Sequence, residues 1–179
     1  MKTLIYITII FFCIVLSNCK NDKKEDPIPT TPKNTWSQMS CKLDGKDWSD
    51  CGKTIIGTKE SNTGGEWFKN FVNQPLKIYG ITNCDNNNSF VNIYLADFNS
   101  VAVYHLANYN NVSYTIQYPA GNVEYKTNSS HIGTLSITKF DSIRNKVSGT
   151  FSFEGFNADS NRIVKITDGK FTDISFYVN

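Results

Sequence analysis

The chain has 179 residues, of which 40% are hydrophobic and 19% are charged, and this length and composition suit one globular domain. Its 18 basic and 16 acidic side chains nearly cancel, so nucleic-acid binding has no electrostatic support. The composition also excludes a disordered chain, a coiled coil and a collagen-like repeat.

The first 18 residues are predicted to be a signal peptide. Lys2 gives a basic start, and Leu4 to Leu16 is a run of 13 almost unbroken apolar residues, whereas a membrane-spanning helix needs about 20. A short apolar run behind a positive charge is typical of an export signal. The closing sequence Leu16-Ser17-Asn18-Cys19 resembles a bacterial lipobox, which implies lipidation of Cys19. The alternative is an ordinary cleaved signal followed by a structural cysteine.

Residues 19–35 are expected to be the lipidated cysteine and a flexible polar linker. The segment from Lys20 to Lys33 has three prolines and no apolar periodicity, so it cannot bury enough surface to offset the entropy of ordering. The lipobox resemblance implies that this linker joins the domain to the outer membrane through lipid, on the periplasmic side or exposed at the cell surface. The charged residues after Cys19 have two interpretations. They form a solvated linker, or they resemble the charged export tag of Bacteroidota surface lipoproteins; the residues are Lys20, Asp22, Glu25 and Asp26.

From residue 36 to residue 179 the sequence predicts one β domain. In Lys146–Phe156 apolar or small residues alternate with polar ones, which places the two sets on opposite faces of a strand. Residues 39–43 alternate in the same way, and Asp44-Gly45 predicts a two-residue hairpin turn that sets Cys41 opposite Trp48. A second turn is predicted at Asp168-Gly169, which sets Ile166 opposite Phe171. The other predicted strands are Lys53–Gly57, Leu76–Thr82, Phe90–Phe98, Val101–Leu106, Ser113–Tyr118, Asn122–Lys126, Ile132–Phe140, Arg162–Thr167 and Lys170–Tyr177.

This spacing of short strands and turns indicates an all-β fold, an antiparallel β-sandwich of roughly ten short strands. A curled, calycin-like β-barrel is the alternative. We favour the sandwich because Phe90–Phe98 is apolar at both sets of alternating positions and needs cover on two faces. Helical signals are nearly absent, and Glu60–Asn73 is the one segment with room for a short helical turn.

Four segments are similar to a family of small Bacteroidota lipoproteins of unknown function. They are Gly133–Asp141, Val147–Phe153, Ile166–Phe171 and the hairpin Leu43–Trp48. The resemblance implies an all-β lipoprotein domain and carries over no catalytic residue.

Motifs for catalysis and metal binding are scarce. His105 and His131 lack the spacing of metal ligands, and there is no Cys-x-x-Cys pair, nucleophile elbow or phosphate-binding loop. We therefore expect no enzyme activity, no cofactor and no metal site. His105 alternates with Val101 and Val103, which favours a partly buried strand position over a catalytic base. Gly149 and Gly155 are expected at bends or close backbone approaches.

The cysteines allow one disulfide in the exported domain. Cys41, Cys51 and Cys84 follow the lipobox cysteine, and an oxidising export route lets a bond persist. We expect Cys41 to be a buried free thiol, which leaves Cys51 and Cys84 as the candidate pair. Three buried thiols are the alternative.

Two functions remain as hypotheses. The first is a membrane-anchored exported lipoprotein with a structural or protein-binding role. The second is a glycan-binding module, because aromatic rings stack on sugars and amides bond to hydroxyls; the plainer interpretation places the rings in the core. In addition, Asp141-Ser142-Ile143 resembles an O-glycan acceptor sequence of Bacteroidota, which implies modification of Ser142. The aromatic residues in question are Trp36, Trp67, Phe68, Tyr104, Tyr109, Tyr114 and Tyr118.

Overall fold

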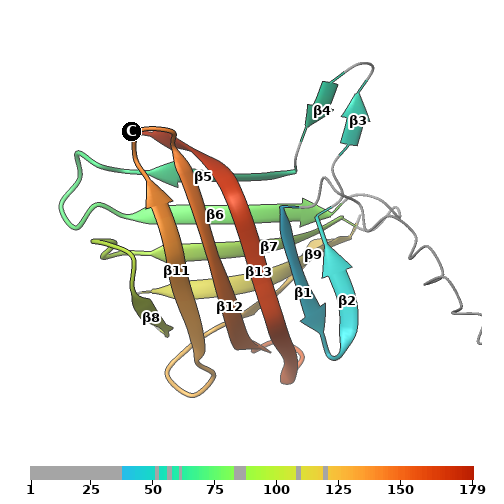
Figure 1. Ribbon diagram of the computed structural model, residues 1–179. Helices are drawn as coiled ribbons and strands as arrows, with labels where there is room; N and C mark the ends of the chain where they lie inside the picture. The colour runs from blue at the N-terminus through green and yellow to red at the C-terminus, as the bar shows by residue number, and fades with distance from the viewer. Residues whose placement is uncertain are drawn as a thin grey trace, which may run out of the picture. The chain divides into compact units, whose positions relative to one another are not determined.

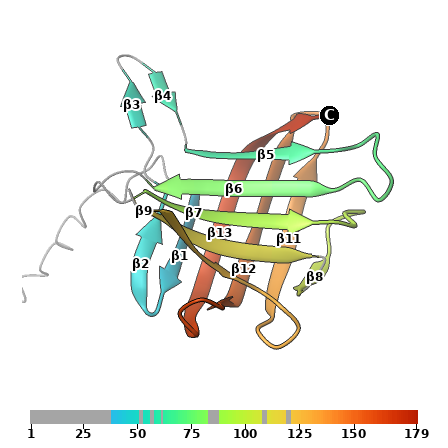
Figure 2. The ribbon, with the colours of Figure 1, turned by 180° about the vertical axis from the view of Figure 1, so that it is seen from behind.

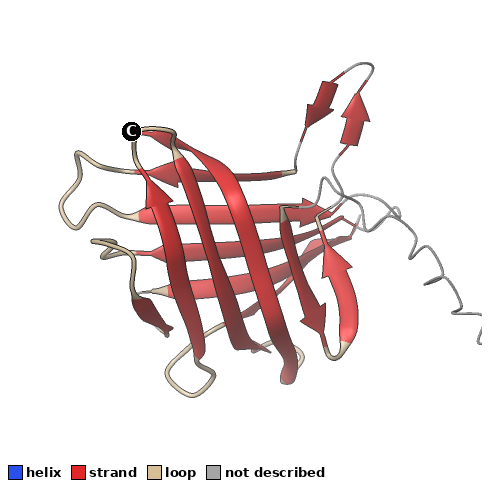
Figure 3. Ribbon diagram, viewed as in Figure 1, coloured by secondary structure: helices blue, strands red, loops and turns tan. Residues whose placement is uncertain are grey.

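The computed structural model describes residues 38–50, 53–55, 58–60, 62–82, 88–107, 110–118 and 121–179. All belong to one compact unit, Asn34–Asn179. Every regular element within them is a strand (Figure 3), which confirms the predicted all-β class. The strands are β1 (Met39–Leu43), β2 (Lys46–Ser49), β3 (Lys53–Ile55), β4 (Thr58–Glu60), β5 (Thr63–Trp67), β6 (Leu76–Thr82), β7 (Asn88–Leu95), β8 (Val103–Leu106), β9 (Asn111–Tyr118), β10 (Gly121–Lys126), β11 (Gly133–Asp141), β12 (Lys146–Asn157) and β13 (Arg162–Val178).

One sheet of 11 strands folds over itself into two layers. Its order is β2-β1-β13-β5-β6-β7-β9-β10-β12-β11-β8, and β12 also pairs with β13. The strands β1, β2, β11, β12 and β13 run down one layer, and β5, β6, β7 and β9 run crosswise behind them (Figure 1). The view from behind shows the same crossing (Figure 2). Because β12 pairs with both β10 and β13, the hydrogen-bonded strands also close into a ring, so the sandwich has a barrel-like pairing.

The core lies between the two layers and follows from alternation along each strand. Leu135 and Ile137 of β11 point inward and are at most 1% exposed, as are Ile78 and Ile93 of β6 and β7. The residues next to these four along each strand are exposed or only partly buried, which is the expected pattern for an antiparallel sheet with one solvated face. Phe171 of β13 is the largest side chain that is fully buried.

The β1–β2 hairpin confirms the turn predicted at Asp44-Gly45. Both turn residues have positive φ, 47° and 82°, and Cys41 lies opposite Trp48 as expected. The buried indole Nε1 of Trp48 donates a hydrogen bond to Ser89 Oγ of β7 at 2.9 Å. This bond joins the hairpin to the crosswise layer.

The turn predicted at Asp168-Gly169 is wrong. Strand β13 runs without a break from Arg162 to Val178, and its pairing with both β12 and β1 shifts by one residue at this point. The pair therefore forms a β-bulge, in which Asp168 has a φ of 52°. This bulge uses at Asp168 the left-handed backbone conformation that a tight turn would also use, so the two share a local sequence signal.

Strand β5 (Thr63–Trp67) lies within Glu60–Asn73, the segment predicted to have room for a short helical turn. It contains Gly64 and Gly65, which weaken a strand pattern, but both are needed for close approach. A Cβ on Gly64 would lie 2.7 Å from the Tyr79 ring, and one on Gly65 would lie 2.8 Å from the carbonyl oxygen of Lys77. Strand β5 is also parallel to β13, whereas the other pairings are antiparallel.

The glycines predicted at close approaches in β12 are confirmed. A Cβ on Gly149 would strike the Ser136 carbonyl oxygen and lie 2.6 Å from the Phe171 ring, and one on Gly155 would lie 3.0 Å from the backbone of Tyr125. The strand predicted over Phe90–Phe98 ends at Leu95, while Phe98 packs into the core from the following loop.

Candidate functional site

Hydroxyl side chains gather on the solvent face of β11, β12 and β13, here called the hydroxyl face. Two cross-strand pairs form its centre: Thr134 lies opposite Ser152, and Ser136 lies opposite Thr150. Their neighbours in sequence point into the core, so alternation forces these four side chains outward. Thr167 of β13 extends the set across a third strand, and the bulge leaves Thr167 and Asp168 both exposed.

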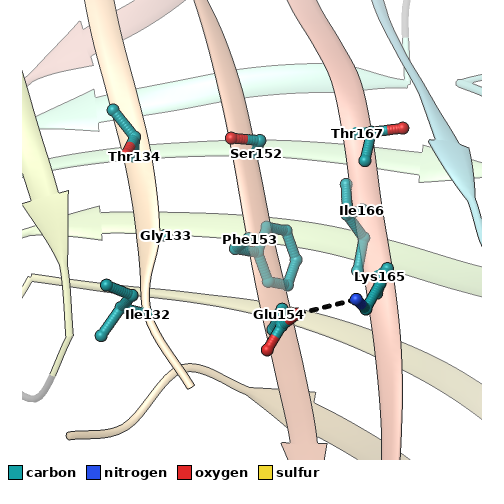
Figure 4. A pocket seen from close by; sticks show the side chains of 9 residues that line it. All are labelled: Ile132, Gly133, Thr134, Ser152, Phe153, Glu154, Lys165, Ile166 and Thr167. Atoms are coloured by element: carbon teal, nitrogen blue, oxygen red, sulfur yellow. Dashed lines mark ion pairs between the residues drawn. The ribbon is translucent and has the colours of Figure 1, made fainter. Parts of the chain in front are cut away.

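Two shallow hollows lie on the hydroxyl face. The first measures about 320 Å³, and its rim includes Thr134, Ser152 and Thr167 (Figure 4). The second measures about 570 Å³ and continues from the first over Ser136 and Thr150. Each hydroxyl can both donate and accept a hydrogen bond, so this surface suits a polar partner rather than an apolar one.

Opposite charges border the first hollow. Lys165 Nζ lies 3.2 Å from Glu154 Oε1, in a cross-strand pair of β13 and β12 (Figure 4). His131 Nδ1 lies 3.7 Å from the other oxygen of Glu154, and its ring stacks on Phe156 with centroids 4.9 Å apart. Since the Lys165 and Glu154 side chains are 67% and 42% exposed, the pair contributes little to stability and is accessible to a partner.

His105 lies at the edge of the same face, where its predicted environment is wrong. It pairs with Thr134 in the register of β8 and β11 and is exposed rather than partly buried. Val101 and Val103 share its side of the chain and are 52% and 62% exposed. The alternation was therefore real, but the apolar residues marked the solvent side of an edge strand.

The aromatic residues predicted for sugar stacking do not meet on a described surface. Trp67, Tyr104 and Tyr114 are each only 8% exposed and belong to the core. Trp67 packs edge-on against Phe98, Phe140 and Phe176, while Phe68 is half-buried. Trp36, Tyr109 and the side chain of Tyr118 lie outside the described residues.

Cys41 is a free, buried thiol, as predicted. Burial raises the pKa of this thiol from 9.0 to about 12, so it stays protonated at neutral pH and is a poor nucleophile. Cys19, Cys51 and Cys84 lie outside the described residues, so the lipidation site and the candidate disulfide stay predictions.

Ser142 is exposed in the turn between β11 and β12. The Asp141 carboxylate accepts hydrogen bonds from the backbone N–H groups of Ile143 at 3.0 Å and Arg144 at 2.8 Å. The bond from Arg144 is the main cause of a lowered pKa of Asp141. Asp141 therefore fixes the shape of the turn that presents Ser142.

Within the part of the chain that the structure describes, no group of three His, Cys, Asp or Glu side chains is arranged to hold a metal ion. The described residues also include no helix with the length and apolar character needed to cross a membrane.

Comparison with known proteins gives a family but no characterised relative. Searches of curated proteins and of solved structures found no significant match. The family model described as "Domain of unknown function (DUF6252)" matches residues 69–175. The match spans the hydroxyl face and the middle of the chain, but it says nothing of lipidation or bacterial group. Because the family model covers more than half of the chain, the protein belongs to this family. This confirms the expectation that the chain is a member of a family of unknown function.

Proposed function

We propose that this protein is a binding module of the cell envelope, held on a membrane by lipid, which recognises a protein partner through its hydroxyl face. The observation that carries the proposal is the alignment of four hydroxyl side chains in two adjacent cross-strand pairs, Thr134 with Ser152 and Ser136 with Thr150. The two hollows join along these residues into one polar strip.

The shape of the strip favours a large partner. Sites for small molecules are usually concave and cover most of the ligand, whereas both hollows here are shallow and open. The charges beside the strip have both signs, with Glu154 next to Lys165 and Asp168 near Lys170. A polar rim with mixed charge suits a partner surface of complementary charge, where such groups set orientation more than affinity.

We assign no catalytic step to the hydroxyl face. Activation of a hydroxyl nucleophile needs a base within hydrogen-bond reach. Two histidines lie on this face: His105 is opposite Thr134 in the strand register, and His131 Nδ1 lies 3.7 Å from Glu154 while its ring stacks on Phe156. Among the described residues, neither ring is hydrogen-bonded to a hydroxyl of the strip. A binding role without chemistry therefore accounts best for the arrangement.

The proposed membrane attachment rests on Cys19 and the apolar run before it. Cleavage before Cys19 and acylation of its thiol would anchor the mature chain at the outer membrane, on the periplasmic side or at the cell surface. Several acyl chains hold a protein far more firmly than one. Labelled palmitate should enter the wild-type protein and not the Cys19→Ala variant. Equal labelling of both would disprove the anchor.

The binding proposal is tested by cross-linking in the native envelope. Ser152→Arg and Thr150→Arg place bulky cations on the hydroxyl face and should abolish a cross-linked complex that the wild type forms. Ser49→Arg is the matched control, because Ser49 is an exposed strand serine on β2, away from the strip. Loss of the complex in all three variants, or in none, would reject the hydroxyl face as the binding surface.

A glycan partner is the alternative outcome. The hydroxyl groups support this alternative, because they can bond to sugar hydroxyls. The described residues include no cluster of exposed aromatic rings on which a sugar could stack, which counts against it. Binding of the wild type to a glycan array, lost in Ser152→Arg and kept in Ser49→Arg, would replace the protein partner by a sugar.

We also propose that Ser142 carries an O-glycan, which is supported by its exposure in the β11–β12 turn and by the resemblance of its flanking residues to an acceptor sequence. Intact-mass measurement of protein from its native host should show glycan mass that the Ser142→Ala variant lacks. An unmodified wild-type mass would end this proposal.

A further inference from the structure

One end of the domain exposes large apolar side chains from three separate segments, here called the apolar corner. They are Phe71 and Val72 in the β5–β6 loop, Ile143 in the β11–β12 turn, and Tyr177 and Val178 at the end of β13. Their exposed fractions are 60%, 88%, 94%, 73% and 44% in that order. Exposed apolar clusters of this kind mark sites of interaction with proteins or membranes.

Backbone hydrogen bonds bring the three segments to the same end. Phe176 N–H of β13 donates to the Asn145 carbonyl of the β11–β12 turn at 3.1 Å. Asn179 N–H donates to the Trp67 carbonyl at 2.9 Å, just before the β5–β6 loop begins. Figures 1 and 2 both show the loop, the carboxyl terminus and the upper end of β11 at this end of the domain.

The β5–β6 loop has a defined conformation that presents its apolar tip. Phe68 N–H donates to the Pro75 carbonyl at 2.9 Å, which closes the base of the loop, and Gln74 N–H donates to the Phe71 carbonyl at 3.1 Å. The Phe68 and Phe71 rings pack edge to face with centroids 5.4 Å apart. These bonds and the ring contact hold the loop in the conformation that leaves Val72 exposed at its tip.

We propose that the apolar corner inserts into the interfacial region of an anionic lipid bilayer. Two exposed cations flank the apolar side chains: Lys69 lies two residues before Phe71, and Arg144, with 81% of its side chain exposed, follows Ile143. Apolar side chains that enter the headgroup region next to basic ones combine area burial with attraction to anionic lipid. Arg144 Nη1 also lies 3.9 Å from Asp141 Oδ2 in the same turn, so attraction to anionic lipid competes with this exposed ion pair. Insertion of Ile143 requires an unmodified Ser142, because an O-glycan at that exposed residue would keep the turn in water.

The inference rests on the proposed lipid anchor, and the length of the linker allows it. The described structure begins at Gln38, whose carbonyl accepts a hydrogen bond from Thr172 N–H of β13. From Thr172 to Val178 the strand rises about 20 Å. The chain from Cys19 to Gln38 can reach at most roughly 60 Å when extended, so the anchored chain is long enough for the corner to touch the membrane that holds it.

The test measures membrane depth at a single residue of the full lipidated protein. Val72→Trp is reconstituted into vesicles of phosphatidylcholine and phosphatidylglycerol, with and without brominated acyl chains, and emission of the native tryptophans is subtracted with the wild type. Brominated lipid should quench the added tryptophan. Ile163→Trp is the matched control, because Ile163 is a 47% exposed residue at the opposite end of β13, and its emission should not change.

The outcome separates this inference from the anchor. If vesicles retain the protein while brominated lipid leaves Val72→Trp unquenched, the anchor stands and the apolar corner does not insert. Quenching at Val72 together with absence of palmitate on Cys19 would support the insertion and reject the anchor. Equal quenching at Val72 and Ile163, or cross-linking of Val72 to a protein without quenching, would also overturn the inference.

Discussion

Substitution of Gly149 by alanine tests how closely strand β12 must approach its two neighbours, β11 and β13. Gly149 lies on β12 at the point where its pairing with both β11 and β13 shifts by one residue. A Cβ at this position would strike the backbone carbonyl oxygen of Ser136 and lie 2.6 Å from the ring of Phe171. Phe171 is only 1% exposed, so its ring has little room to move away.

The expected loss of stability follows from these contacts. Adding a methyl group to a filled core costs about 1–3 kcal/mol, and we expect the upper part of this range because one obstacle is backbone. For a domain of this size, 1 kcal/mol corresponds to a fall in Tm of about 3 °C. Gly149→Ala should therefore lower Tm by roughly 6–9 °C.

Urea unfolding followed by tryptophan emission measures the effect, in the chain that lacks residues 1–19. Thr150→Ala is the control, because the Thr150 side chain is exposed and its removal should change the free energy of unfolding by less than about 0.5 kcal/mol. In a Phe171→Leu background, which opens space beside Gly149, the alanine should cost less. A Gly149→Ala variant as stable as the wild type would refute the conclusion that Gly149 is required for the close approach of β11 and β13 to β12.

Three further predictions concern single side chains. The pKa of Cys41 is raised to about 12 from 9.0, so native protein holds this proton more tightly and its stabilisation is lost as pH rises from 9 to 12. Between pH 8 and pH 10 the free energy of unfolding of the wild type should therefore fall by about 1 kcal/mol more than that of Cys41→Ala, as measured by urea titration at both pH values. Ser89→Ala removes the acceptor of the buried Trp48 indole and should cost about 1–3 kcal/mol in urea titrations. The Lys139 ammonium, 2.8 Å from Asp173 Oδ1, is the main cause of the lowered pKa of Asp173. Lys139→Met should raise that pKa in an NMR titration, and an unchanged value would contradict this cause.

The strands that the sequence predicts best are those whose two faces differ. Strand β12 alternates over its whole length because one face meets the core and the other meets water, and the β1–β2 hairpin combines alternation with a turn dipeptide. The Asp168-Gly169 pair shows the limit of local signals, since its backbone preference serves a turn and a bulge equally. Strand β5 was missed because its glycines are selected by contacts with Tyr79 and Lys77, which belong to another strand.

The hydroxyl face could be predicted only in part. Alternation places Ser152 and Thr150 on the solvent side of β12, but the sequence does not say which residues of β11 lie opposite. The pairing of Thr134 with Ser152 depends on register, and the addition of Thr167 depends on the bulge. His105 was misjudged because valine on a short edge strand is not a sign of burial.

The position of β13 has a consequence for the time course of folding. This strand, the last along the described chain, pairs with β1, β5 and β12, and Gln38 bonds to a residue 135 positions away on it. Contacts so distant in sequence require closure of long loops, which slows folding. During synthesis, β1 and β5 lack the strand that lies beside both of them until β13 has emerged. The ring of paired strands therefore cannot close before Arg162–Val178 is available, and the earlier strands must wait in an open state.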